Sequence, residues 1–170
     1  LKKKPEISDI IGLSMHSNVT NENSFSSSSE LLNSIQEAAK RTFLANLISV
    51  QSDCPAREKF GYGGDLNATS ESFIYNFDMQ SFYRKTIYDW VDAMNDSIFI
   101  DTAPFVGIKY CGLSWESAFL ITQYYLYLYY NDTEIIKELY TLNNDWMDKA
   151  ARIHPDGIVD KGLSDHESLE

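Results

Sequence analysis

The chain has 170 residues, of which 44% are apolar and 14% aromatic, so it is long enough and apolar enough for one domain with a hydrophobic core. Its net charge of -11 argues against nucleic acid and anionic membrane surfaces as partners, because proteins that bind either are basic. No apolar run approaches the roughly 20 residues of a membrane span, and the sequence contains no glycine-rich nucleotide loop and no CxxC metal motif.

The first 25 residues are expected to lead into the fold. The apolar run over 7–16 predicts one short β-strand, which needs a partner sheet to be stable, or else a linker. A serine-rich stretch then precedes a helix predicted from about 26 to 48, with apolar residues at i, i+3 and i+4 and therefore one buried face.

Four further helices are expected, separated by loops that contain Gly, Pro or Asn-Asp. They are predicted at about 66–77, 78–95, 114–130 and 133–151. The segment 119–130 is apolar nearly all round, so we expect protein to surround it. Because strands and helices do not alternate, the pattern favours an all-α fold of the α/α toroid type.

The stretch 53–65 reads Asp-Cys-Pro-Ala-Arg-Glu-Lys-Phe-Gly-Tyr-Gly-Gly-Asp. One proline and three glycines predict a loop, and loops on rigid scaffolds often carry catalytic residues. The loop brings together Asp53, Glu58 and Asp65, with Arg57 among them. Crowded carboxylates raise one another's pKa and a guanidinium lowers it, and such splitting gives a site one acid and one base. From the spacing alone, a solvated acidic turn remains the alternative.

This stretch resembles the signature of the bacterial α-L-rhamnosidases of glycoside hydrolase family 78, Asp-Cys-Pro-x-Arg-Asp/Glu followed by Gly-Trp-x-Gly-Asp. The matching positions are Asp53, Cys54, Pro55, Arg57, Glu58, Gly61, Gly64 and Asp65. Tyr62 departs from the pattern, because the family usually has Trp there. More weakly, residues 112–118 resemble the family's Gly-Trp-Gly-Asp-Ala segment, with Glu116 at the Asp position. Residues 164–166 resemble its Gly-Asp-Trp, with His166 at the Trp position.

The resemblance implies an (α/α)6 barrel that hydrolyses terminal α-L-rhamnose with inversion, as in α-L-rhamnosidase (EC 3.2.1.40). It places the general acid on Glu58. The residues that it implies for sugar binding are Asp53, Arg57, Tyr62, Asp65, Glu116 and His166. The three departures leave open a different sugar or a weakened site. Glu116 also suits a first-turn acid that offsets the helix dipole, and His166 a solvated position. Trp90, Trp115 and Trp146 are expected in the core.

An inverting glycosidase needs a second carboxylate, roughly 6.5–9.5 Å from the acid, to activate water. The resemblance implies that this base lies on a later helix, and twelve helices need more than 170 residues. We therefore expect residues 26–170 to be the N-terminal part, about half, of an (α/α)6 catalytic domain that is inactive alone. Residues 1–25 are expected to leave a preceding β-sandwich.

No cofactor and no metal are expected, and the expected partner is a rhamnose-containing carbohydrate from plant glycosides or polysaccharides. A half-barrel exposes an apolar edge, which predicts a homodimer. Two alternatives are a non-catalytic carbohydrate-binding domain and a helical interaction domain whose loop is structural. Cys54 and Cys111 are expected to be two buried thiols rather than a disulfide. A periplasmic or extracellular location is favoured over a cytoplasmic one.

Overall fold

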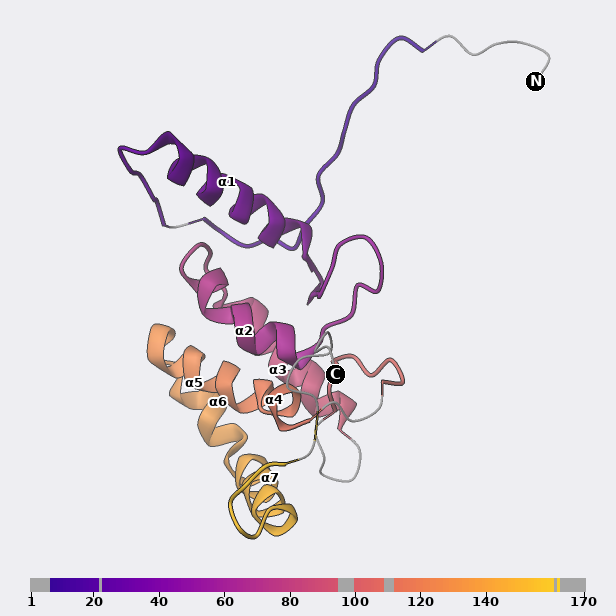
Figure 1. Cartoon of the computed structure of the whole chain (residues 1–170), viewed down its shortest axis with the longest axis vertical. Coiled ribbons are helices and arrows are strands. Elements are labelled where there is room, and N and C mark those ends of the chain that lie inside the picture. Colours follow the sequence, from indigo (N-terminus) through magenta and orange to yellow (C-terminus); the bar gives the residue numbers. More distant parts are fainter. Residues whose placement is uncertain (1–6, 22, 95–99, 109–111, 161, 163–170) are drawn as a thin grey trace, which may run out of the picture.

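Helices make up most of the structure (Figure 1). The computed structural model describes residues 7–21, 23–94, 100–108, 112–160 and 162. The helices are α1 (Glu30–Ala45), α2 (Gly63–Ile74), α3 (Gln80–Ala93), α4 (Leu113–Glu116), α5 (Ala118–Tyr130), α6 (Thr133–Glu138) and α7 (Tyr140–Ile153). Two short strands, β1 (Leu47–Ile48) and β2 (Val50–Gln51), pair as an antiparallel hairpin between α1 and the loop that precedes α2. None of the described helices is both long and apolar enough to cross a bilayer.

The strand predicted over 7–16 is wrong, because the described residues 7–21 form neither helix nor strand. Figure 1 shows this segment running away from the helices. Its isoleucines are exposed, for example Ile10, and a strand without a partner edge has nothing to satisfy its hydrogen bonds. Contact with the fold begins at Ser17, whose main-chain N–H donates to the Leu47 carbonyl at 2.6 Å. The alternative, a linker from a preceding domain, stays a prediction.

Helix α1 begins as predicted at a serine cap, because the Ser29 hydroxyl accepts from the Leu32 N–H. Its expected buried face is wrong in part. Within α1, every residue of which is described, none is fully buried, and Leu31 is 68% exposed. Only the C-terminal half packs on the core, where the Phe43 and Phe73 rings lie 4.3 Å apart. Several apolar side chains of α1 are therefore exposed. The apolar edge of a half-barrel and the homodimer stay predictions.

Two of the predicted helices are broken. The segment expected at 114–130 divides into α4 and α5 at Ser117, and that expected at 133–151 divides into α6 and α7 at Leu139. Helix α5 packs against both α2 and α3, and its residues Phe119 and Leu126 are completely buried. The expectation that protein surrounds α5 holds on that side only, because Tyr124, Tyr127 and Leu128 on its other side are exposed.

A buried polar network fixes the hairpin that precedes the candidate site. The Tyr83 hydroxyl from α3 donates to Gln51 Oε1 at 2.9 Å and lies 3.2 Å from the Ser70 carbonyl in α2. Gln51 Nε2 in turn donates to Thr69 Oγ1 at 2.7 Å. Burial raises the pKa of Tyr83 well above its usual value, so the hydroxyl stays protonated as a donor. Strand β2 is thereby tied to α2 and α3, the two helices that flank the site.

Candidate functional site

The loop over 53–62 is closed by its first acid. The Asp53 N–H donates to the Phe60 carbonyl at 3.0 Å, and Asp53 Oδ1 accepts from the Phe60 N–H at 2.9 Å. This pair of bonds fixes the ends of an eight-residue turn, on which Arg57 and Glu58 are exposed. Asp53 therefore uses one carboxylate oxygen to hold the loop in shape.

The end of the loop pairs with residues 101–103. The Gly63 N–H donates to the Asp101 carbonyl at 2.8 Å, and the Ala103 N–H donates to the Gly61 carbonyl at 3.0 Å. Tyr62 and Thr102 form the antiparallel bridge between these bonds. The candidate site thus rests on a second loop, which the sequence motif does not include.

The motif glycines are required by close packing. A Cβ atom on Gly61 would lie 2.4 Å from the Ala103 carbonyl oxygen, and one on Gly63 would lie 2.0 Å from the Trp115 carbonyl oxygen. A Cβ atom on Gly64 would lie 2.7 Å from Trp115 Cε2. Helix α2 can start against α4 only because no side chain intervenes.

Glu58, the expected general acid, is exposed and oriented by a neighbour. The Tyr62 hydroxyl donates to Glu58 Oε2 at 2.8 Å, and the Tyr62 ring lies beside Phe60 with ring centroids 6.0 Å apart. The resemblance implies Tyr62 as a sugar-binding residue, and in the structure its hydroxyl is directed at the acid. Asp65 is half-buried in the first turn of α2, where a carboxylate is favoured by the helix dipole.

Glu116 is the buried acid beside this loop. It is 7% exposed, and Trp146 Nε1 on α7 donates to its Oε2 at 3.2 Å. Burial is the main cause that raises the pKa of Glu116 to about 7, and the nearby charge of Asp101 raises this pKa further. The hydrogen bond from Trp146 and the charge of Lys149 both act to lower it. At neutral pH this carboxyl is therefore divided between its protonated and ionised forms.

Asp101 joins the two parts of the site, and sequence reasoning missed it. Its main chain holds Gly63, and its 2% exposed side chain acts electrostatically on Glu116. It lies in a loop without periodicity, and only its place two residues before Ala103-Pro104 distinguishes it. Sequence spacing gives no sign that it would reach the motif.

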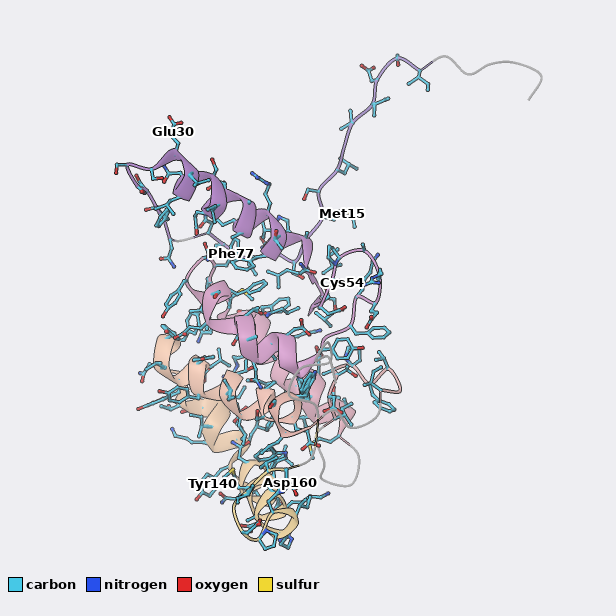
Figure 2. The ribbon with its side chains drawn as sticks, viewed as in Figure 1. Met15, Glu30, Cys54, Phe77, Tyr140 and Asp160 are labelled. Atoms are coloured by element: carbon cyan, nitrogen blue, oxygen red, sulfur yellow. The ribbon has the colours of Figure 1, made fainter. Side chains whose placement is uncertain are left out.

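The tryptophans and cysteines named from the sequence lie in different environments. Trp90 and Trp146 are buried as expected, whereas Trp115 is half-buried and covers the glycines at the start of α2. Cys54 is a free, half-buried thiol. Figure 2 labels it on the loop before α2. His166 and Cys111 lie outside the described residues. Among the residues that the structure describes, no group of His, Cys, Asp or Glu is arranged to hold a metal ion.

Comparison with known families identifies the class of domain. Residues 20–170 match the model of the bacterial alpha-L-rhamnosidase six-hairpin glycosidase domain. The chain therefore belongs to the bacterial alpha-L-rhamnosidase six-hairpin family, and the prediction of an all-α chain forming part of an (α/α)6 barrel is confirmed.

Individual relatives agree with this family. An alpha-L-rhamnosidase of Formosa agariphila is 28% identical over 175 residues, covering 95% of this chain and 18% of the relative. One of Streptomyces avermitilis is 28% identical over 159 residues, covering 92% of this chain and 15% of the relative. The chain thus spans less than a fifth of the length of the curated relatives it matches.

Solved structures agree as well. The alpha-L-rhamnosidase of Dictyoglumus thermophilum superposes with a TM-score of 0.82 at 32% identity, over 87% of this chain and 17% of that one. The Streptomyces avermitilis alpha-L-rhamnosidase, whose crystal structure is a complex with L-rhamnose, superposes with a TM-score of 0.81 at 26% identity. That match covers 89% of this chain and 15% of the relative.

Proposed function

We propose that this chain carries the acid half of an α-L-rhamnosidase active site, with Glu58 as the general acid. The observation that supports this most is the state of Glu58. It lies within the family motif, on a loop closed by Asp53, and its carboxylate is exposed and held by the Tyr62 hydroxyl. An acid that must reach a bound substrate has to be both accessible and oriented.

The chemistry requires such a group. A glycosidic oxygen leaves readily only when it is protonated as the bond to the anomeric carbon breaks. Glu58 would give its proton to that oxygen, while a base carboxylate on the opposite face removes a proton from the attacking water. Inversion follows because water attacks from the side opposite the leaving group. We propose that this base lies outside residues 1–170, so that the chain alone does not hydrolyse rhamnosides.

Sugar binding would be shared among the acids and the guanidinium around Glu58. Asp53 and Asp65 would accept hydrogen bonds from rhamnose hydroxyls, with Arg57 beside them and the Tyr62 ring against the sugar. Because Glu116 is almost completely buried and interacts electrostatically with Asp101, we assign it a structural role rather than a sugar contact. His166 stays a prediction as a sugar contact.

Residues 26–170 would then form the first part of the catalytic domain, and residues 1–25 the segment that leads into it. The chain covers only 18% and 15% of the length of the two relatives, which supports this arrangement. The substrate class would be terminal α-L-rhamnose on glycosides or polysaccharides.

The test uses the complete open reading frame that encodes residues 1–170, assayed with an aryl α-L-rhamnoside. Glu58→Gln should lower kcat/KM by about 10²–10⁴-fold, the usual contribution of a general acid. Glu134→Gln on α6, an exposed acid paired with Lys137, is the matched control and should leave kcat/KM unchanged. Equal activity of Glu58→Gln and the parent would refute the role of Glu58. Absence of hydrolysis by the parent would refute the enzyme itself and favour a carbohydrate-binding domain.

A further inference from the structure

Two hollows lie near the C-terminal end of α2, away from the candidate catalytic loop. One has a volume of about 210 Å³ and the other about 380 Å³. Tyr75, the residue that ends α2, lines both of them. The larger volume falls within the roughly 300–1,000 Å³ of typical small-ligand sites. Because Tyr75 is common to both linings, the two hollows are together called the groove.

The groove is distant from the catalytic loop. Tyr75 lies twelve positions after Gly63, the first residue of α2, which at 1.5 Å per residue is about 18 Å. Figure 2 shows Cys54 on the loop before α2 and Phe77, which lines the smaller hollow, near the other end of that helix. A ligand in this groove would therefore not occupy the site around Glu58.

Tyr75 is both exposed and held. The residue is 57% exposed and is therefore accessible to a ligand. Its hydroxyl lies 3.2 Å from Glu71 Oε1 and 2.9 Å from the Tyr129 hydroxyl, and its carbonyl accepts from Asn23 Nδ2 at 2.8 Å. The Tyr129 ring meets it edge to face with centroids 5.8 Å apart. A platform whose rotamer is fixed in advance loses little conformational entropy when a ligand stacks on it.

The rest of the lining selects the kind of ligand. The larger hollow is lined by hydroxyl and amide side chains, from Ser24, Gln36, Ser72 and Asn76, beside Phe25 and Phe43. Gln36 Nε2 already donates to Asn76 Oδ1, and Asn76 Nδ2 donates to the Ser72 carbonyl, so the remaining hydroxyls and the Gln36 oxygen are the groups open to a ligand. The smaller one adds the carboxylate of Asp78. Among the described residues, none that lines either hollow is Lys or Arg, and the chain has a net charge of -11, so an anionic ligand is disfavoured. Aromatic faces with neutral donors and acceptors suit a neutral, hydroxyl-rich chain.

We propose that this groove is a second carbohydrate-binding site, which holds a neutral oligosaccharide with one sugar unit on each side of Tyr75. Such a site would keep a polymeric or branched glycan on the protein independently of the bonds made at Glu58. The proposal does not depend on whether Glu58 catalyses hydrolysis.

The probe is an array of neutral plant and algal oligosaccharides of two to six sugar units, followed by calorimetric titration of the tightest ligand. The protein is the product of the complete open reading frame. Arg57→Ala/Glu58→Gln, both at exposed positions, impairs recognition at the catalytic loop and prevents hydrolysis of the probe, and should leave binding in the groove unchanged. In that background Tyr75→Ala should weaken binding at least tenfold, whereas Tyr75→Phe should retain it. Tyr127→Ala, an exposed tyrosine on α5 outside the groove, is the matched control.

Since Tyr75→Ala also removes bonds to Glu71 and Tyr129, a second variant is needed. Ser72→Arg places a long side chain in the larger hollow from an exposed position, so the fold is expected to tolerate it. Loss of binding in both Tyr75→Ala and Ser72→Arg, with unchanged circular dichroism, would support the proposal. Failure of every oligosaccharide to bind, or binding that survives Ser72→Arg, would overturn it. Binding lost only in Arg57→Ala/Glu58→Gln would place all recognition at the catalytic loop and would also overturn it.

Discussion

The hydroxyl of Tyr62 donates a 2.8 Å hydrogen bond to the carboxylate of Glu58, four residues earlier in the same loop. The bond fixes the direction of an otherwise exposed side chain. Tyr62→Phe keeps the ring and removes the bond, so kcat/KM for an aryl α-L-rhamnoside should fall by about tenfold, the equivalent of one net hydrogen bond. Tyr127→Phe on α5 should have no effect, and an unchanged rate in Tyr62→Phe would show that Glu58 is oriented by other means.

Gly63→Ala should destabilise the fold. The added Cβ atom would lie 2.0 Å from the Trp115 carbonyl oxygen, so α2 and α4 would have to separate. We expect the free energy of unfolding to fall by more than about 2 kcal/mol, as for other overpacked sites. Gly12→Ala is the control, because nothing lies within 4 Å of a Cβ atom there. Urea titration of both variants measures the difference, and equal midpoints would contradict the packing described.

The buried Glu116 should make stability depend on pH. Its folded pKa of about 7 lies above its ordinary value of 4.5, so between these values the unfolded chain has lost a proton that the folded chain keeps. The stabilising contribution is complete below pH 4.5 and is lost as pH rises through about 7. The loss amounts to roughly 3 kcal/mol at 1.36 kcal/mol per unit.

Other carboxylates titrate in the same range, so the comparison must be made with Glu116→Gln. The difference in unfolding free energy between the parent and this variant should change between pH 4.5 and 7 and be constant above about 7.5. A difference that is independent of pH would show that Glu116 ionises normally.

Tyr83→Phe should weaken the attachment of the β1–β2 hairpin to α2 and α3. It leaves Gln51 Oε1 in the interior without the donor that it has in the parent, at 2.9 Å. A buried acceptor deprived of its partner costs about 1–3 kcal/mol. Thermal unfolding of Tyr83→Phe beside Tyr127→Phe, which changes an exposed ring, separates this effect from the loss of a hydroxyl in general. Identical melting temperatures would mean that the buried network contributes nothing.

The order of helices could be predicted from the sequence because periodicity and caps are local. Ser29 caps α1 where serine was expected, and residues 53–62 form the predicted loop. The loop ends earlier than predicted, because Gly63, Gly64 and Asp65 already belong to α2. The breaks at Ser117 and Leu139 escaped prediction because neither residue is a strong breaker; the turns there depend on how α5 and α7 pack. The strand predicted over 7–16 failed because a strand depends on an edge elsewhere in the protein.

Only those residues of the candidate site that belong to the family motif could be predicted from the sequence. Asp53 and Glu58 were found because they stand at fixed spacing in a known signature. Asp101 was not, because its contacts with Gly63 and Glu116 join residues that are far apart in sequence. The burial of Glu116 likewise arises from Trp146 on α7, thirty residues later, and no local pattern reports it.

The most direct test of Glu58 as the general acid is the dependence of the reaction on the leaving group. Glu58→Gln in the product of the complete open reading frame should hydrolyse a 2,4-dinitrophenyl α-L-rhamnoside nearly as fast as the parent, because that phenol leaves without a proton. The same variant should be slower by about 10²–10⁴-fold on an alkyl α-L-rhamnoside, whose alkoxide must be protonated. An equal loss on both substrates would contradict the assignment and would leave Glu58 with a role in binding alone.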